Sequence, residues 1–60
     1  MEAATEYSKA GDMFKKVGDI ERAATMYYSA GDAYYDAGLK SKVDEMYEKA
    51  AAIYYEGIEK

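Results

Sequence analysis

The stretch YYSAGDAYYDAG, residues 27–38, holds two tyrosine pairs separated by the small-residue segment 30–32. Strong helix formers surround this stretch and the chain contains no proline, so we expect an all-α fold. Tyr27, Gly31 and Tyr34 are spaced by three or four residues, which places them on one face of a helix. A glycine in the middle of a helix costs about 1 kcal/mol relative to alanine. We therefore expect a second helix to pack closely on this face.

The same pattern recurs at a constant interval along the chain. The first two copies share these aligned residues: Tyr7 with Tyr27, Ala10 with Ala30, Gly11 with Gly31, Asp12 with Asp32 and Gly18 with Gly38. The second and third copies share Met26 with Met46, Tyr27 with Tyr47, Ala30 with Ala50, and Tyr34-Tyr35 with Tyr54-Tyr55. The repeating unit is one helix and one short turn, used three times. Such repeats predict stacked helices whose faces are covered by their neighbours.

Glycines and capping residues set the expected ends of the helices. Gly18 and Gly38 are typical of helix C-termini, and Asp19 is typical of the N-cap of the helix that follows. Ser41, with Asp44 three residues later, resembles a capping box. We expect a single domain over residues 1–60, with antiparallel neighbours and helices over 3–16, 20–37 and 41–58.

The helix faces also predict a core. The residues expected to be buried are Tyr7, Ala10, Phe14, Val17, Ile20, Ala23, Tyr27, Ala30, Tyr34, Val43, Met46, Tyr47, Ala50 and Tyr54. In the middle helix, the first member of each tyrosine pair is expected to face the first helix. The second members, Tyr28 and Tyr35, are rotated by about 100° and are expected to pack against the third helix. Tyr55 has no obvious partner within the chain.

Composition argues against several classes of function. The chain has no cysteine and no histidine, so it lacks thiolate ligands, the commonest metal ligand and the usual general base. The acidic residues are scattered without a metal-ligand spacing, and we expect neither an enzyme nor a cofactor or metal site. The net charge of −4 argues against nucleic acid as a partner.

The chain is also expected to stay outside membranes. No apolar run approaches the roughly 20 residues that span a bilayer. The first residues, MEAATEYSKA, show neither the basic segment nor the apolar segment of a signal peptide. We therefore expect a cytoplasmic location without membrane insertion.

Two aspartates recur with the repeat, Asp12 and Asp32. A recurring polar residue on a packed helix points to a hydrogen bond or an ion pair with the neighbouring helix. Arg22 and Lys42 are possible partners for the two carboxylates. The other acidic residues are expected to lie on solvated helix faces, and Met13, Met26 and Met46 to fill the core.

The stretch YSKAGDMFKKVGDIERAATMYYSA, residues 7–30, resembles a tetratricopeptide repeat (TPR). Tyr7 and Phe14 stand at aromatic positions of that family, Gly18 falls in its turn, and Ala23 and Tyr27 match its second helix. The proline common at the end of that repeat is absent, and the two-helix period is longer here than in that family. The chain is more similar to the longer hairpins of the soluble NSF attachment protein family (SNAP), of which it would form one and a half. The resemblance implies a protein-binding scaffold without catalytic activity.

Two functions remain as hypotheses. The first is a protein–protein interaction module, because tyrosine and methionine are enriched at interface cores. Its expected contact surface is the open side of the third helix, with residues Met46, Tyr47, Ala51, Tyr54, Tyr55 and Ile58. The second is a structural unit that assembles with copies of itself through open repeat ends, since solenoid ends normally carry polar outer faces. A homo-oligomer is expected in that case.

Overall fold

The structure is a computed structural model that describes residues 2–58, except for the side chain of Ile58. It contains three helices, α1 (Glu2–Lys16), α2 (Ile20–Asp36) and α3 (Lys40–Ile58), and the described residues form no strand. The predicted all-α fold is confirmed, and every helix end lies within one residue of its predicted position. Met1 and residues 59–60 of the predicted domain lie outside the described residues.

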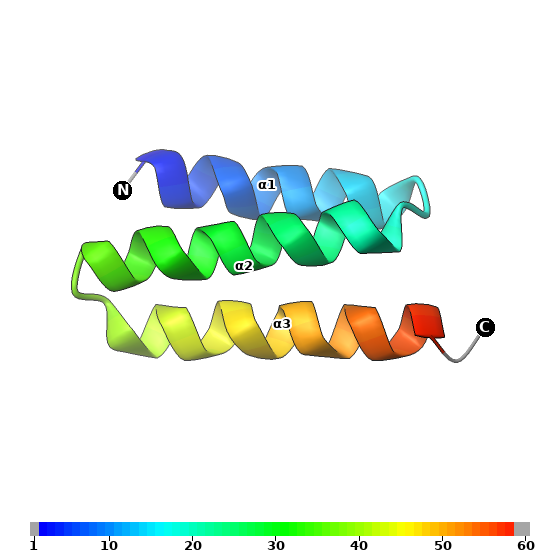
Figure 1. Cartoon of the computed structure of the whole chain (residues 1–60). Coiled ribbons are helices and arrows are strands. Elements are labelled where there is room, and N and C mark those ends of the chain that lie inside the picture. Colours follow the sequence, from blue (N-terminus) through cyan, green and yellow to red (C-terminus); the bar gives the residue numbers. More distant parts are fainter. Residues whose placement is uncertain (1, 59–60) are drawn as a thin grey trace.

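The helices lie side by side in one layer, with α2 in the middle and consecutive helices antiparallel (Figure 1). α2 makes the extensive contacts, one set with α1 and the other with α3. The outer helices α1 and α3 each pack mainly on α2. Each of them therefore keeps a broad face away from the core. This arrangement decides which aromatic residues are covered and which stay in solvent.

Both turns between the helices have the same geometry. Gly18 has a positive φ of 84°, and its N–H donates to the carbonyl of Lys15 at 3.1 Å. The N–H of Asp19 donates to the carbonyl of Phe14 at 2.8 Å. This pair of hydrogen bonds is a Schellman motif, which satisfies carbonyls left free at a helix end. The turn at Gly38, with φ of 81°, has the same pattern at the equivalent position of the next repeat.

The starts of α2 and α3 differ. The side chain of Asp19 accepts a hydrogen bond from the N–H of Arg22 at 3.2 Å, which confirms Asp19 as the N-cap of α2. α3 begins at Lys40, directly after Leu39, whose side chain has no acceptor. Ser41 therefore lies inside the first turn of α3, and the predicted capping box at this residue is wrong.

Replacing Gly18 by alanine is expected to lower the free energy of unfolding by about 1–2 kcal/mol, because a left-handed conformation strains an L-residue by that amount. A Cβ at Gly18 would meet no atom within 4 Å, so the backbone alone causes the loss. Urea unfolding followed by circular dichroism measures the change. D-alanine, introduced by chemical synthesis, is the control, because it accepts positive φ and should not destabilise the fold. Equal losses with both alanines would contradict this assignment.

The core is built mainly from small and aliphatic residues around one large ring. Its buried members are Ala23, Ala24, Tyr27, Ala30, Met46, Ala50 and Ile53, with Phe14, Ile20 and Tyr34 partly buried against them. Ala4 and Val43 are also buried. Tyr27 is the largest fully buried side chain, with 2% of its surface exposed. The prediction of Ala23, Tyr27, Ala30, Val43, Met46 and Ala50 as core residues is confirmed.

Several predicted core residues lie elsewhere. Tyr7, Met13, Val17 and Tyr54 are exposed, so their assignment to the core is wrong. Val17 follows the last residue of α1 and lies in the turn, where no helix covers it. Tyr7 and Tyr54 lie at the flanks of helices that pack mainly on α2, so part of each ring stays in solvent. The remaining predicted residues, Ala10, Phe14, Ile20, Tyr34 and Tyr47, are half-buried.

Candidate functional site

Two glycines receive tyrosine rings from the next helix along the chain. A Cβ added to Gly11 in α1 would lie 2.9 Å from Cε1 of Tyr27 in α2. A Cβ added to Gly31 in α2 would lie 2.6 Å from Cε1 of Tyr47 in α3. Real Cβ atoms do not approach ring atoms this closely, so glycine is what allows these rings to pack on the helix backbone. The expected close approach at both glycines is confirmed.

The same two tyrosines are held by carboxylates next to the glycines. The hydroxyl of Tyr27 donates a hydrogen bond to the carboxylate of Asp12. The hydroxyl of Tyr47 donates to Oδ1 of Asp32 at 2.7 Å. We call each set a tyrosine–glycine–aspartate contact: Tyr27 with Gly11 and Asp12, and Tyr47 with Gly31 and Asp32. The contacts join α1 to α2 and α2 to α3 with the same residue types.

The partners of the recurring aspartates differ from those expected. Both aspartates do bond to the neighbouring helix, but the donors are tyrosine hydroxyls. The expected pairing with Arg22 and Lys42 is wrong. Nε of Arg22 lies 3.5 Å from Asp19, and Nζ of Lys42 lies 3.7 Å from Glu45. Each cation therefore pairs with an acidic residue three positions away along the chain rather than with a carboxylate on the adjacent helix.

Both contacts raise the pKa of the phenol. Burial, followed by the hydrogen bond to Asp12 and its negative charge, raises the pKa of Tyr27 from 10.0 to about 12. The hydrogen bond to Asp32 is the largest cause of the raised pKa of Tyr47, followed by burial and by the charges of Asp32, Tyr28 and Tyr35. In both cases the protonated phenol is the form that the fold stabilises.

The free energy of unfolding is expected to fall as the pH rises from 10 to about 12, because the unfolded chain then releases the Tyr27 proton that the folded chain retains. Below pH 10 both states hold the proton and the stabilisation is fully present. Urea midpoints measured across this range test the expectation. Tyr27→Phe should flatten the decline, whereas Tyr55→Phe, at an exposed position, should leave the slope unchanged. An identical slope in the two variants would refute the linkage.

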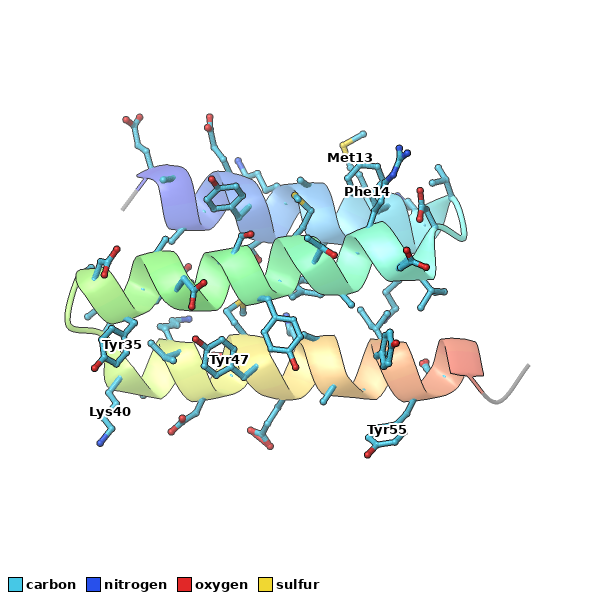
Figure 2. The ribbon with its side chains drawn as sticks, viewed as in Figure 1. Met13, Phe14, Tyr35, Lys40, Tyr47 and Tyr55 are labelled. Atoms are coloured by element: carbon cyan, nitrogen blue, oxygen red, sulfur yellow. The ribbon has the colours of Figure 1, made fainter. Side chains whose placement is uncertain are left out.

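A row of tyrosines follows the boundary between α2 and α3. We call it the tyrosine seam, and its members are Tyr28, Tyr35, Tyr47 and Tyr54. The ring centroids of Tyr28 and Tyr47 are 5.5 Å apart with the ring planes tilted by 47°, an arrangement typical of attractive aromatic pairs. Tyr35 is close enough to act on the pKa of Tyr47. Tyr35, from α2, and Tyr47, from α3, both lie along this boundary in Figure 2.

Most of the tyrosine seam is open to solvent. Tyr28 is 50% exposed, Tyr35 69% and Tyr54 52%, whereas Tyr47 is half-buried by its contact with α2. Tyr54 lies two helical turns after Tyr47 and therefore on the same face of α3. The expected packing of Tyr28 against α3 is confirmed by its contact with Tyr47. The ring nevertheless leaves half of its surface accessible to another molecule.

The predicted contact surface on α3 divides into several parts. Met46 is buried with 4% of its surface exposed, which corrects its assignment to an exposed surface. Tyr47 and Tyr54 belong to the tyrosine seam. Tyr55 is exposed and points away from α2 at the outer edge of α3 (Figure 2), and Ala51 is half-buried. The side chain of Ile58 lies outside the described residues.

A small groove lies on the other side of α3 from the tyrosine seam. Its volume is about 170 Å³, and it is lined by Asp12, Lys15, Tyr27, Lys49, Ala52, Ile53 and Glu56. Nζ of Lys49 lies 5.7 Å from the centre of the Tyr27 ring, within the range of a cation–π contact. The groove carries charges of both signs and thus shows no preference for an anion or a cation.

Comparisons with protein-family models, curated proteins and solved structures find no match for the chain. Within residues 2–58, no three acidic, histidine or cysteine side chains lie together in a way that could hold a metal ion. None of the helices, over the part of the chain that the structure describes, is long and apolar enough to cross a membrane. The tyrosine seam, with its exposed rings beside the hydrogen-bonded Tyr47, is the candidate functional site.

Proposed function

We propose that the chain is a non-catalytic protein–protein interaction module, built from helical repeats of the TPR-like or SNAP-like kind. Its partner is a protein, which it contacts through the tyrosine seam. The observation that supports this most is the row of Tyr28, Tyr35 and Tyr54, each at least half exposed, beside the fixed ring of Tyr47. Tyrosine is enriched at the centre of protein interfaces because it offers a large apolar face and a polar hydroxyl.

The contacts that hold two rings of the tyrosine seam also favour binding. Tyr47 is held on Gly31, and its hydroxyl is bonded to Asp32 at 2.7 Å. A side chain fixed before binding loses less conformational entropy when the partner arrives. Tyr28 packs on this fixed ring, so two of the four rings are already positioned. Pre-positioned aromatic side chains are a common basis of affinity in protein interfaces.

The second candidate is a structural unit that assembles with its own copies. Exposed apolar side chains outside the seam support it. Met13 lies in α1, Val17 directly follows α1, and Tyr55 lies at the outer edge of α3. Sedimentation equilibrium over a wide concentration range separates the two candidates. A folded monomer at every concentration supports a foreign partner, and a mass that rises with concentration supports self-assembly.

Peptides selected from a random phage-displayed library on the wild-type chain provide the probe for the first candidate. We expect Tyr28→Ser and Tyr35→Ser each to weaken binding of the selected peptides by about tenfold or more, the effect of losing an interface hot spot. Tyr55→Ser is the matched control, because Tyr55 is similarly exposed but lies outside the seam. Loss of binding only in the control would place the interaction at the edge of α3 and contradict the proposal.

A further inference from the structure

The two tyrosine–glycine–aspartate contacts show how this chain joins one helix to the next. In each case a helix offers a glycine followed by an aspartate, and the next helix offers a tyrosine. We call the glycine and aspartate the acceptor pair and the tyrosine the donor. α2 carries both parts, since Tyr27 is a donor to α1 and Gly31 with Asp32 is an acceptor for α3. The contact thus recurs with the repeat, once between α1 and α2 and once between α2 and α3.

α1 carries a donor whose acceptor pair is not in the described structure. Tyr7 occupies the position in the first repeat that Tyr27 and Tyr47 occupy in the second and third. It is 40% exposed, and its hydroxyl forms no hydrogen bond within residues 2–58. In α2, the alanines on either side of the donor, Ala23 and Ala30, are fully buried by neighbouring helices.

The corresponding residues of α1 are only partly covered. Ala3, which aligns with Ala23, is exposed, and Ala10, which aligns with Ala30, is half-buried. This face of α1 thus has the small and aromatic residues of an interhelical contact without the second helix. We call it the Tyr7 face, defined by Ala3, Tyr7 and Ala10.

We propose that the Tyr7 face docks an α-helix of another chain that carries a glycine followed directly by an aspartate. The helix lies antiparallel to α1, its glycine receives the ring of Tyr7, and its aspartate accepts the hydroxyl. This contact continues the interfaces that α1 forms with α2 and α2 forms with α3, with the same atoms in the same roles. The surface is distinct from the tyrosine seam, so the inference goes beyond the proposed function.

An unmodified second copy does not supply this helix. Its two acceptor pairs are filled, the first by Tyr27 and the second by Tyr47. The aligned positions in α3 are Ala51 and Ala52. At Gly11 and Gly31, a Cβ would lie within 3 Å of the donor ring, so the Cβ of Ala51 would block a ring in the same place. Ala52 has no carboxylate to accept the hydroxyl.

The test converts α3 into an acceptor. The acceptor chain carries Ala51→Gly and Ala52→Asp together with Tyr7→Ala, so it cannot act as a donor through Tyr7. The donor is the wild-type chain labelled with ¹⁵N. We expect a saturable 1:1 complex in an NMR titration, with the largest shifts on the Tyr7 face of the donor. Tyr7→Ala in the donor should abolish binding, and Tyr7→Phe should weaken it by roughly five- to tenfold, the effect of one lost hydrogen bond.

Controls separate this contact from other associations. An acceptor with Ala52→Asp alone keeps the blocking Cβ and is expected not to bind. A synthetic peptide of residues 22–38, which contains Ala30-Gly31-Asp32, serves as a second probe that needs no folded variant. Shifts on the Tyr7 face with both probes would support the proposal. The proposal would be overturned if neither probe caused shifts or if the shifts were confined to the tyrosine seam. It would also be overturned if a chain that keeps Ala51 and Ala52 bound as tightly as the acceptor chain.

Discussion

Replacing Tyr27 with alanine is expected to unfold most of the chain at room temperature. Removing a buried aromatic side chain costs about 3–5 kcal/mol, because apolar contacts are lost and a cavity is left. A core of this size supplies on the order of 3–5 kcal/mol of net stability. Tyr27 is the largest fully buried side chain, packs on Gly11 in α1 and lies beside Lys49 in α3. Its loss therefore weakens the core that all three helices share.

Far-UV circular dichroism measures the result as a loss of helicity, and urea unfolding quantifies partial losses. Tyr27→Phe keeps the ring and removes only the hydrogen bond to Asp12, so about 1 kcal/mol should be lost. Tyr55→Ala is the control for an exposed tyrosine and should change stability by less than about 0.5 kcal/mol. A Tyr27→Ala chain with the wild-type urea midpoint would disprove the central position of this ring.

Alanine at Gly11 or Gly31 is expected to destabilise the chain, although alanine favours helices by about 1 kcal/mol relative to glycine. The added Cβ would lie 2.9 Å from the Tyr27 ring or 2.6 Å from the Tyr47 ring. Overpacking of this kind costs about 1–3 kcal/mol, which exceeds or cancels the gain in helix propensity. The larger loss is expected at Gly11, because only 2% of the Tyr27 surface is exposed. Tyr47 is half-buried and can turn outward, with loss of its bond to Asp32.

A double-mutant cycle tests the cause of this loss. In a chain that carries Tyr47→Leu, the ring is absent and Gly31→Ala should become stabilising, with a coupling of about 0.5–3 kcal/mol between the two positions. Ala52→Gly, at an exposed site in α3, gives the effect of helix propensity alone and should cost about 1 kcal/mol. If Gly31→Ala raised the free energy of unfolding by as much as Ala52→Gly lowers it, the Tyr47 ring would not restrict the residue at position 31.

Local chemistry makes the helices and turns predictable from the sequence. Gly18 and Gly38 mark their turns because positive φ is accessible to glycine at little cost. Asp19 caps α2 because its side chain accepts a hydrogen bond from the N–H of Arg22, three residues later. Gly11 and Gly31 are also predictable, because a glycine within a helical pattern indicates close packing. These features depend on residues within one or two turns of each other, where spacing along the chain determines geometry.

The polar contacts and the flank residues are less predictable. Asp12 and Asp32 bond to tyrosines 15 positions later, and that pairing depends on how far one helix slides along the next. The exposure of Tyr54 and the burial of Ile53 depend on the rotation of α3 about its own axis. Adjacent apolar stripes on a helix have similar periodicity, so the pattern alone does not choose between them. The tyrosine seam is missed for the same reason, since the pattern predicts that Tyr28 and Tyr35 pack against the third helix but not how much of each ring stays exposed.

The identical turns after α1 and α2 have a consequence for fusions with other domains. Each turn reverses the chain direction, so the start of α1 and the end of α3 lie at opposite ends of the helix layer (Figure 1). Adding or deleting one unit of helix and turn would leave every Schellman motif intact but return the chain to the end where it began. An odd number of helices thus places two domains attached to the termini at opposite ends of the helix layer, and an even number places them at the same end. The length of the linkers does not change this.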